Sequence, residues 1–298
     1  MAQTAKADPQ STTVLKDLAA RHGLRAAGAL PTLAVYVRQL WGYRHFIGSY
    51  ANARVSSSLG TTRLGRGWQV LTPLINAAVY YLIFGVVLDQ KRQIGNFVGY
   101  LCVGVFVFIF TQSTVSAGMS SITGNLGLIR ALHFPRASLP IAVALVEVQH
   151  LIASMGVLVG IVLIFGEPLT LQWLLLPPAL LMQTLFNAGL ALTVARLGAK
   201  LTDLRQVIPF VMRFWMYGSA VLFPVTMFQE LLSGWPLAVV EANPLLVYIE
   251  LVRYALMEEV PLASSPARLW VTGLAWALVT GLGGFIYFWR GEKEYGRG

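Results

Sequence analysis

The sequence has little charge and almost no cysteine. Only 12% of its 298 residues are Asp, Glu, Lys or Arg, whereas soluble domains carry about 25%, and 56% are hydrophobic. Its one cysteine, Cys102, lies inside an apolar run. A disulfide framework within the chain is therefore excluded, and metal binding through cysteine is not expected. Apolar runs of about 20 residues in so uncharged a chain predict an all-α protein that crosses a membrane several times.

Recognisable catalytic and cofactor motifs are also lacking. We find no Ser-His-Asp set, no paired carboxylates and no cluster of metal ligands, and the four histidines are scattered. The stretch 60–67, GTTRLGRG, approaches the phosphate-binding pattern GxxxxGK[ST], but Arg66 stands in place of the lysine and Gly67 in place of the hydroxyl residue. We therefore expect no cofactor in this chain. The net charge of +9 does not indicate nucleic-acid binding, because the basic residues fall in short loops between apolar runs.

Six apolar runs are long enough to be membrane-spanning helices. We expect these spans at 68–88, 97–117, 139–165, 171–195, 207–227 and 269–289. The domains expected from this pattern are a disordered cytoplasmic tail at 1–31, an interfacial amphipathic helix with its connector at 32–66, and a six-helix transmembrane domain at 67–298. Apolar residues recur at helical spacing in 32–50, beside Arg38 and Arg44, as in a helix lying in the membrane interface. An ordinary helix packed on a soluble domain is the alternative.

The distribution of basic residues predicts the orientation. Of the 22 Lys and Arg, 17 fall in residues 1–67 before the first span, the segments 125–140 and 196–205, and the C-terminal tail. Four fall in the opposite loops, and Arg213 lies within a predicted span. Because short Lys- and Arg-rich loops stay in the cytoplasm, we expect both termini there. The longest external segment, 228–267, should form one or two short re-entrant or interfacial helices, with a solvated loop as the alternative.

Two charged residues lie inside predicted spans. Glu147 and Arg213 lie at similar depths in their predicted spans, counted from the cytoplasmic end of each span. A charge at such a position costs about 2.5–3.5 kcal/mol on insertion scales, so each needs a partner or water. We expect the two to lie close enough to interact, either as a structural ion pair or as a site for a substrate phosphate or hydroxyl.

A basic stretch separates the second and third predicted spans. It reads NLGLIRALHFPRASLP over 125–140 and holds Arg130, His133 and Arg136 beside Phe134 and Pro135. Its charge places it on the cytoplasmic side. If a cytoplasmic motor drives this membrane domain, we expect the motor to push here, with Phe134 and Pro135 forming a rigid apolar knob.

Aromatic residues are dense in the first, second and fifth predicted spans. Most aromatics in spans pack or anchor at the interface. Rings that face a pore would instead suit sugars, whose C–H faces stack on them. The candidates for such a channel are Tyr80, Tyr81, Phe84, Phe106, Phe110, Phe214, Trp215 and Tyr217.

Four stretches together resemble the permease subunits of ABC exporters for O-antigen and teichoic-acid polysaccharides. They are GRGWQVLTPLINAAVYYLIFG at 65–85, NLGLIRALHFPRASLP at 125–140, ARLGAKLTDLRQVIPFVMRFWMYGSAVLFPV at 195–225 and ANPLLVYIELVRYAL at 242–256. Their order and spacing carry the resemblance, which covers the chain from about residue 33 to its end. The chain departs from the family pattern at Asp203 and Phe223. The YVRQLWGYRHFI stretch at 36–47 is also similar to the branch that exports mycobacterial galactan.

The resemblance implies a bacterial inner-membrane channel built from two copies of the chain, with two separate cytoplasmic subunits that bind Mg-ATP. A lipid-diphosphate-linked polysaccharide would cross from the inner to the outer leaflet. Segment 125–140 and the interfacial helix would contact the ATPase subunit. External helices would form a gate that includes Trp235, Asn243, Pro244 and Tyr248.

Two other functions stay open from the sequence. A membrane-embedded enzyme acting on an isoprenoid-linked glycan would need acidic pairs for magnesium in cytoplasmic loops, and those loops hold only Asp203. A secondary transporter would want more ionisable groups within its spans and an inverted repeat, which is not visible.

Overall fold

The computed structural model describes residues 31–60, 67–87, 96–201, 203–258, 260–292 and 295. All regular elements in these ranges are helices. The tail predicted at 1–31 lies outside the described residues except for Pro31. Four helices are long and apolar enough to cross a membrane: α5 (Phe97–Ser120), α7 (Ser138–Ile164), α8 (Leu176–Lys200, preceded by the 3-10 turn η4, Leu171–Leu175) and α13 (Pro266–Arg290). These agree with the predicted second, third, fourth and sixth spans.

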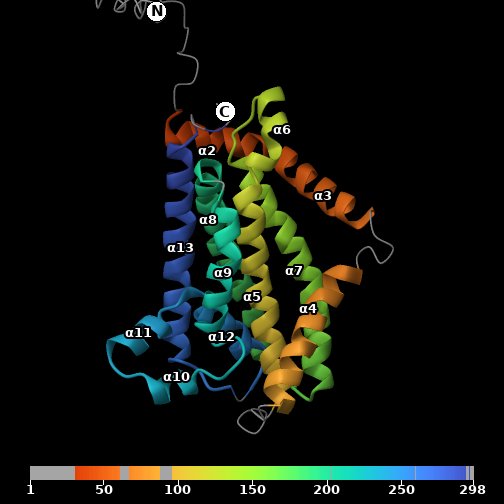
Figure 1. The fold of residues 1–298 in the computed structure, drawn as a ribbon, viewed down its shortest axis with the longest axis vertical. Helices are drawn as coiled ribbons and strands as arrows, with labels where there is room; N and C mark the ends of the chain where they lie inside the picture. The colour runs from red at the N-terminus through yellow and green to blue at the C-terminus, as the bar shows by residue number, and fades with distance from the viewer. Residues whose placement is uncertain are drawn as a thin grey trace, which may run out of the picture.

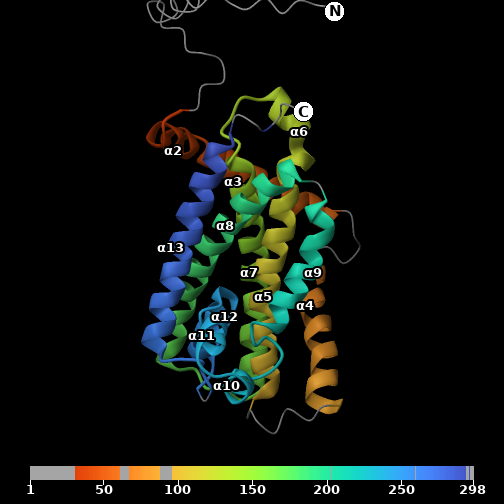
Figure 2. The same cartoon turned by 60° about the vertical axis from the view of Figure 1, so that its left-hand side comes forward.

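Helix α5 lies at the centre of the bundle (Figures 1 and 2), and 17 of its 24 residues are buried. Its first half, residues 97–110, is apolar on all sides, and a helix of that kind belongs in an interior. Helices α7, α8, α9 (Leu204–Tyr217) and α12 (Pro244–Leu256) contact it, as does α4 (Gly67–Tyr80). Helix α4 continues into the π-helical segment η1 (Tyr81–Val87), so the two together occupy most of the predicted first span.

The fifth predicted span, 207–227, is not a single helix. Helix α9 has 14 residues and ends at Gly218, and α10 (Thr226–Leu231) starts after a turn. Ala220 in that turn has a φ of 50°, a left-handed conformation that interrupts helical backbone. At 1.5 Å per residue, α9 is about 21 Å long and shorter than the roughly 30 Å apolar core of a bilayer. The six-span count is therefore not confirmed.

The segment predicted to form one or two short re-entrant or interfacial helices contains α11 (Trp235–Glu241) and α12, which meet at a bend of 60°. Such a pair is either a broken span or a re-entrant loop. Helix α12 is an interior helix, because 11 of its 13 residues are buried. In contrast, α10 and α11 lie at the edge of the bundle, where Leu231 is 73% and Trp235 80% exposed.

Glycines bring α8 and α13 into direct backbone contact along their length (Figure 1). A Cβ added at Gly284 would collide with the backbone oxygen of Gly189, and one at Gly189 with the backbone of Thr280. Small residues at such crossings are typical of membrane helix pairs. A Cβ at Gly156 or Gly160 would meet nothing within 4 Å. This GxxxG pattern therefore makes no close helix crossing among the residues that the structure describes.

Helices α2 (Leu33–Gly42) and α3 (Arg44–Gly60) lie across one end of the bundle, as Figures 1 and 2 show. The same end carries the 3-10 turn η3 (Thr123–Asn125), α6 (Leu126–Ala131) and Arg290 at the end of α13. We call it the α2 face, and the opposite end, with α10 and α11, the α10 face. Helix α3 packs against α7. That α2 and α3 lie in a membrane interface stays a prediction.

Candidate functional site

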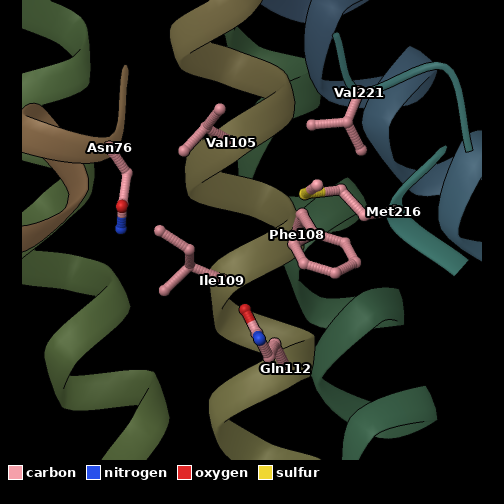
Figure 3. Close-up of a pocket in the computed structure, with 7 residues that line it drawn as sticks. All are labelled: Asn76, Val105, Phe108, Ile109, Gln112, Met216 and Val221. Carbon is pink, nitrogen blue, oxygen red and sulfur yellow. The ribbon is translucent and has the colours of Figure 1, made fainter. Parts of the chain in front are cut away.

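A small pocket opens beside α5, between α4 and α9 (Figure 3). Its volume of about 40 Å³ has room for water but not for a sugar. Residues from α4, α5, α9 and the turn that follows α9 line it: Asn76, Val105, Phe108, Ile109, Gln112, Met216 and Val221. Two of them, Asn76 and Gln112, contribute polar side-chain amides to a pocket whose other lining residues are apolar. The sequence analysis did not single out either residue, although an amide within an apolar run was a visible signal.

A polar stripe on α5 continues from this pocket toward the α2 face. Gln112, Ser116 and Ser120 follow one another at four-residue spacing, so they share one side of the helix. Ser116 is exposed, and the other two are partly buried. Helices α4 and α9 both contact α5, and Figure 2 shows them on the same side of the bundle. The stripe therefore gives this side of the chain hydrogen-bonding groups within an apolar bundle.

The exposed face of α9, which lies away from the pocket-lining Met216, is aromatic. Phe210, Phe214 and Tyr217 recur at three- and four-residue spacing, and all are exposed, Phe214 at 77%. Trp215 is different, because its indole nitrogen donates to Asn243 Oδ1 at 2.8 Å. Two members of the predicted channel set thus lie on an open face, and a third is engaged by the segment before α12.

The other predicted channel aromatics do not share that face. Phe106 and Phe110 are buried in the core of the protomer, so neither ring lies on an open face, and their place on a glycan path stays a prediction. The apolar first half of α5 gives no periodicity from which the direction of these rings could be predicted. Tyr81 packs against Phe97 at a ring distance of 6.4 Å. The side chains of Tyr80 and Phe84 lie outside what the structure describes.

Glu147 and Arg213 do not pair within the described residues. Glu147 Oε2 lies 3.3 Å from His150 Nδ1, one turn further along α7. Arg213 is exposed on α9, and α5 stands between α7 and α9 in both views (Figures 1 and 2). The expected proximity was wrong because similar depth in two helices says nothing about which helix stands between them.

The segment 125–140 has an exposed part and a fixed part. Arg130 and His133 are exposed on the α2 face. Phe134 packs on Phe46 of α3 at a ring distance of 5.2 Å, and Pro135 is buried. Phe134 is partly buried and Pro135 is buried, and their contact with an ATPase subunit stays a prediction.

Arg136 is engaged by the C-terminal segment. Its backbone N–H donates to Glu292 Oε1 at 2.9 Å, and its guanidinium donates to the backbone oxygen of Glu292. Glu292 Oε2 accepts the hydroxyl of Tyr36 at 2.7 Å. Burial raises the pKa of the Glu292 carboxyl, and the hydrogen bonds from Arg136 and Tyr36 partly offset that rise. The sequence analysis missed Glu292, which follows the last span in a short charged tail.

Near the α10 face, a buried arginine joins α12 to its neighbours. Arg253 is 0% exposed, and its guanidinium lies 3.3 Å from the centre of the Tyr100 ring. It donates to the backbone oxygens of Ala220 at 2.9 Å, Val221 at 3.1 Å and Tyr100 at 3.2 Å. The orientation count had placed Arg253 in an external loop. An arginine within an apolar helical stripe was the signal that could have found it.

The four residues predicted as an external gate are not all at the surface. Asn243 caps α12 and donates to the backbone oxygen of Gly218 at 2.8 Å. Pro244 starts α12, and buried Tyr248 donates to the backbone oxygen of Gly273 in α13 at 2.8 Å. Trp235 is the exposed member. A gating role for this set stays a prediction.

Comparison with known proteins agrees with this architecture. The profile of the ABC-2 type transporter family matches residues 50–257. The O-antigen export system permease protein RfbA of Myxococcus xanthus is 26% identical over 194 residues, which is 65% of this chain and 74% of the relative. A protein of the same name from Klebsiella pneumoniae is 25% identical over 213 residues, which is 71% of this chain and 80% of the relative.

The family match covers more than half of the chain, including α5, α7, α8 and α12. Together with the apolar helices, it identifies a multi-pass membrane protein that acts with a separate ATP-binding partner. The chain belongs to the ABC-2 type transporter family, in which it is a permease subunit and not an enzyme.

Proposed function

We propose that the chain is the membrane subunit of an ATP-driven exporter of a lipid-diphosphate-linked polysaccharide, related to O-antigen or galactan. The glycan moves from the cytoplasmic to the outer face of the bacterial inner membrane. Two copies of the chain form the channel, and two cytoplasmic subunits bind Mg-ATP. The similarity to O-antigen export permeases supports the substrate class.

One observation carries this proposal, namely that an apolar bundle has a polar stripe on α5 and an exposed aromatic face on the neighbouring helix α9. Sugar hydroxyls hydrogen-bond to groups such as Gln112 and Ser116, and the C–H faces of sugars stack on rings such as Phe214. An apolar bundle has no structural need for these side chains on an open side. Because the stripe faces out of the protomer, a second copy completes the path.

The charge distribution supports the direction of export. With Arg253 inside the bundle, the segments that the sequence predicts to be external hold three Lys and Arg, against 17 in the segments predicted to be cytoplasmic. The α2 face is then cytoplasmic, and both termini lie there. Arg130 and His133 are exposed on this face, within reach of an ATPase subunit.

The test replaces polar groups of the stripe by a side chain of similar size. Gln112→Leu with Ser116→Ala should lower export about tenfold or more, measured as surface glycan by immunoblot, with unchanged amounts of the permease and its ATPase subunit in the membrane. Val279→Leu, at an exposed position of α13, is the matched control and should export normally. Normal export by the stripe variant would contradict the proposed path. Export without the ATPase subunit would indicate a secondary transporter.

A further inference from the structure

Tyrosine recurs every seven residues through α2 and α3. Tyr36 lies in α2, Tyr43 at the junction and Tyr50 in α3. Each hydroxyl donates to a group far away in sequence: Tyr36 to Glu292 Oε2 at 2.7 Å, Tyr43 to the backbone oxygen of His133 at 2.9 Å, and Tyr50 to Asn125 Oδ1 at 2.6 Å. Lipid anchoring would not require all three hydroxyls to bond within the chain.

The spacing explains how the three side chains reach one surface. Seven residues make nearly two helical turns, so positions seven apart return to almost the same side, about 10 Å further along. The tyrosines therefore contact their partners at regular intervals. Between them, Phe46 packs on Phe134 and stacks on Tyr50 at ring distances of 5.2 and 5.9 Å.

Each tyrosine contacts the connection between α5 and α7, residues 121–137, either directly or through Glu292. Asn125 lies near its beginning and His133 in its second half. At its end, Glu292 accepts the backbone N–H of Arg136 at 2.9 Å, while the backbone N–H of Ala137 donates to the Tyr36 hydroxyl at 3.2 Å. Tyr36 thus joins the connection to the segment that follows α13.

We propose that Tyr36, Tyr43 and Tyr50 clamp this connection to α2–α3, so that the two segments move as one body. A push on the exposed edge at Arg130 and His133 is then passed to α2–α3 and to the segment after α13, as well as directly to α7. The proposal rests on the proposed function only in taking the ATPase subunit as the source of the push.

Hydrogen exchange of the full chain in lipid nanodiscs tests the clamp without any substrate. The variant Tyr36→Phe, Tyr43→Phe, Tyr50→Phe keeps the rings and removes the hydroxyls. Exchange of the backbone amides of 126–137 should become faster by a factor of about five for each hydrogen bond lost. Tyr217→Phe, which removes an exposed hydroxyl from α9, should leave the same amides unchanged. Unchanged exchange in the triple variant would overturn the proposal.

A covalent replacement tests joint movement in the complex with the ATPase subunit. Tyr43→Cys with His133→Cys removes the middle contact, and a short bifunctional thiol reagent restores it, because native Cys102 is buried. The unlinked pair should transport at least twofold less per ATP hydrolysed, and the linked pair should return to the unmodified value. A linked complex that hydrolyses ATP without transport would show that the segments must slide, and would refute the clamp. Absence of glycan transport by the unmodified complex would count against the proposed function, while the exchange result would stand.

Discussion

A buried arginine needs acceptors for its donors, and Arg253 finds them in backbone oxygens of α5 and of the turn after α9. Gly104 makes room for it, since a Cβ there would lie 2.7 Å from the guanidinium and from the backbone oxygen of Val221. The carboxylate of Glu250, one turn earlier, is held by the backbone N–H of Ala263 at 2.9 Å. At the residue scale, these two side chains hold α12 to the surrounding backbone.

Arg253→Met should lower the free energy of unfolding by about 2–4 kcal/mol, because it leaves buried carbonyl oxygens without donors. Thermal unfolding in detergent micelles measures this loss. Arg268→Met is the control, since the Arg268 side chain is 60% exposed and pairs with Glu241 at 3.4 Å, and it should change stability by less than about 1 kcal/mol. Equal losses in the two variants would contradict the role given to Arg253.

Glu292 should make stability depend on pH. Burial raises its pKa in the folded protein, so the folded state holds the proton more tightly than the unfolded state does. Its contribution is fully present below the ordinary glutamate pKa of about 4.3 and is lost as pH rises through the raised value. The melting temperature relative to that of Glu292→Gln should therefore fall as pH rises above the ordinary glutamate pKa of about 4.3. Parallel curves for the two proteins would show that the carboxyl does not titrate in this way.

At the scale of elements, helix contacts decide which glycines matter. Gly284 and Gly189 allow α8 and α13 to touch backbone to backbone. In contrast, a Cβ added at Gly283, the preceding position of α13, would have no atom within 4 Å. Gly283 and Gly284 are the same residue type at nearly the same depth in the bundle. They differ only in the side of α13 on which they lie.

Gly284→Ala should destabilise the protein by about 1–3 kcal/mol, because the added methyl group forces α8 and α13 apart. Gly283→Ala should leave stability unchanged or raise it slightly, since alanine favours helix. Thermal unfolding of the two variants side by side makes the comparison. A smaller loss for Gly284→Ala than for Gly283→Ala would mean that the helix contact is misplaced.

At the scale of the whole molecule, α2, α6 and the end of α13 share one face, and α10 and α11 occupy the other. If the basic face is cytoplasmic, a membrane-impermeant maleimide should label Leu231→Cys in intact cells and Ala131→Cys only after permeabilisation. Both positions are exposed, and native Cys102 is buried. The reverse pattern would invert the orientation and with it the proposed direction of transport.

The sequence alone determined the class of protein and the long helices. Low charge and apolar runs near 20 residues predicted α5, α7, α8 and α13 to within about five residues at each end. Such helices depend mainly on local composition, because a span must be apolar throughout and must satisfy its own backbone hydrogen bonds. The Lys and Arg count uses the same kind of local information, since it needs only the order of loops and spans, and the orientation that it gives stays a prediction.

Only the tertiary structure decided which side of each helix faces what. Phe106 and Phe214 are both phenylalanines in apolar runs, but one is in the core and the other on an open face. Similar depth in their spans predicted that Glu147 and Arg213 lie close together, but α5 stands between the two helices that carry them. Helix α12 and its Arg253 are interior because α5, α8 and α13 pack around them. Such contacts join residues far apart in the chain, so their partners depend on how the helices rotate and pack, which no local pattern encodes.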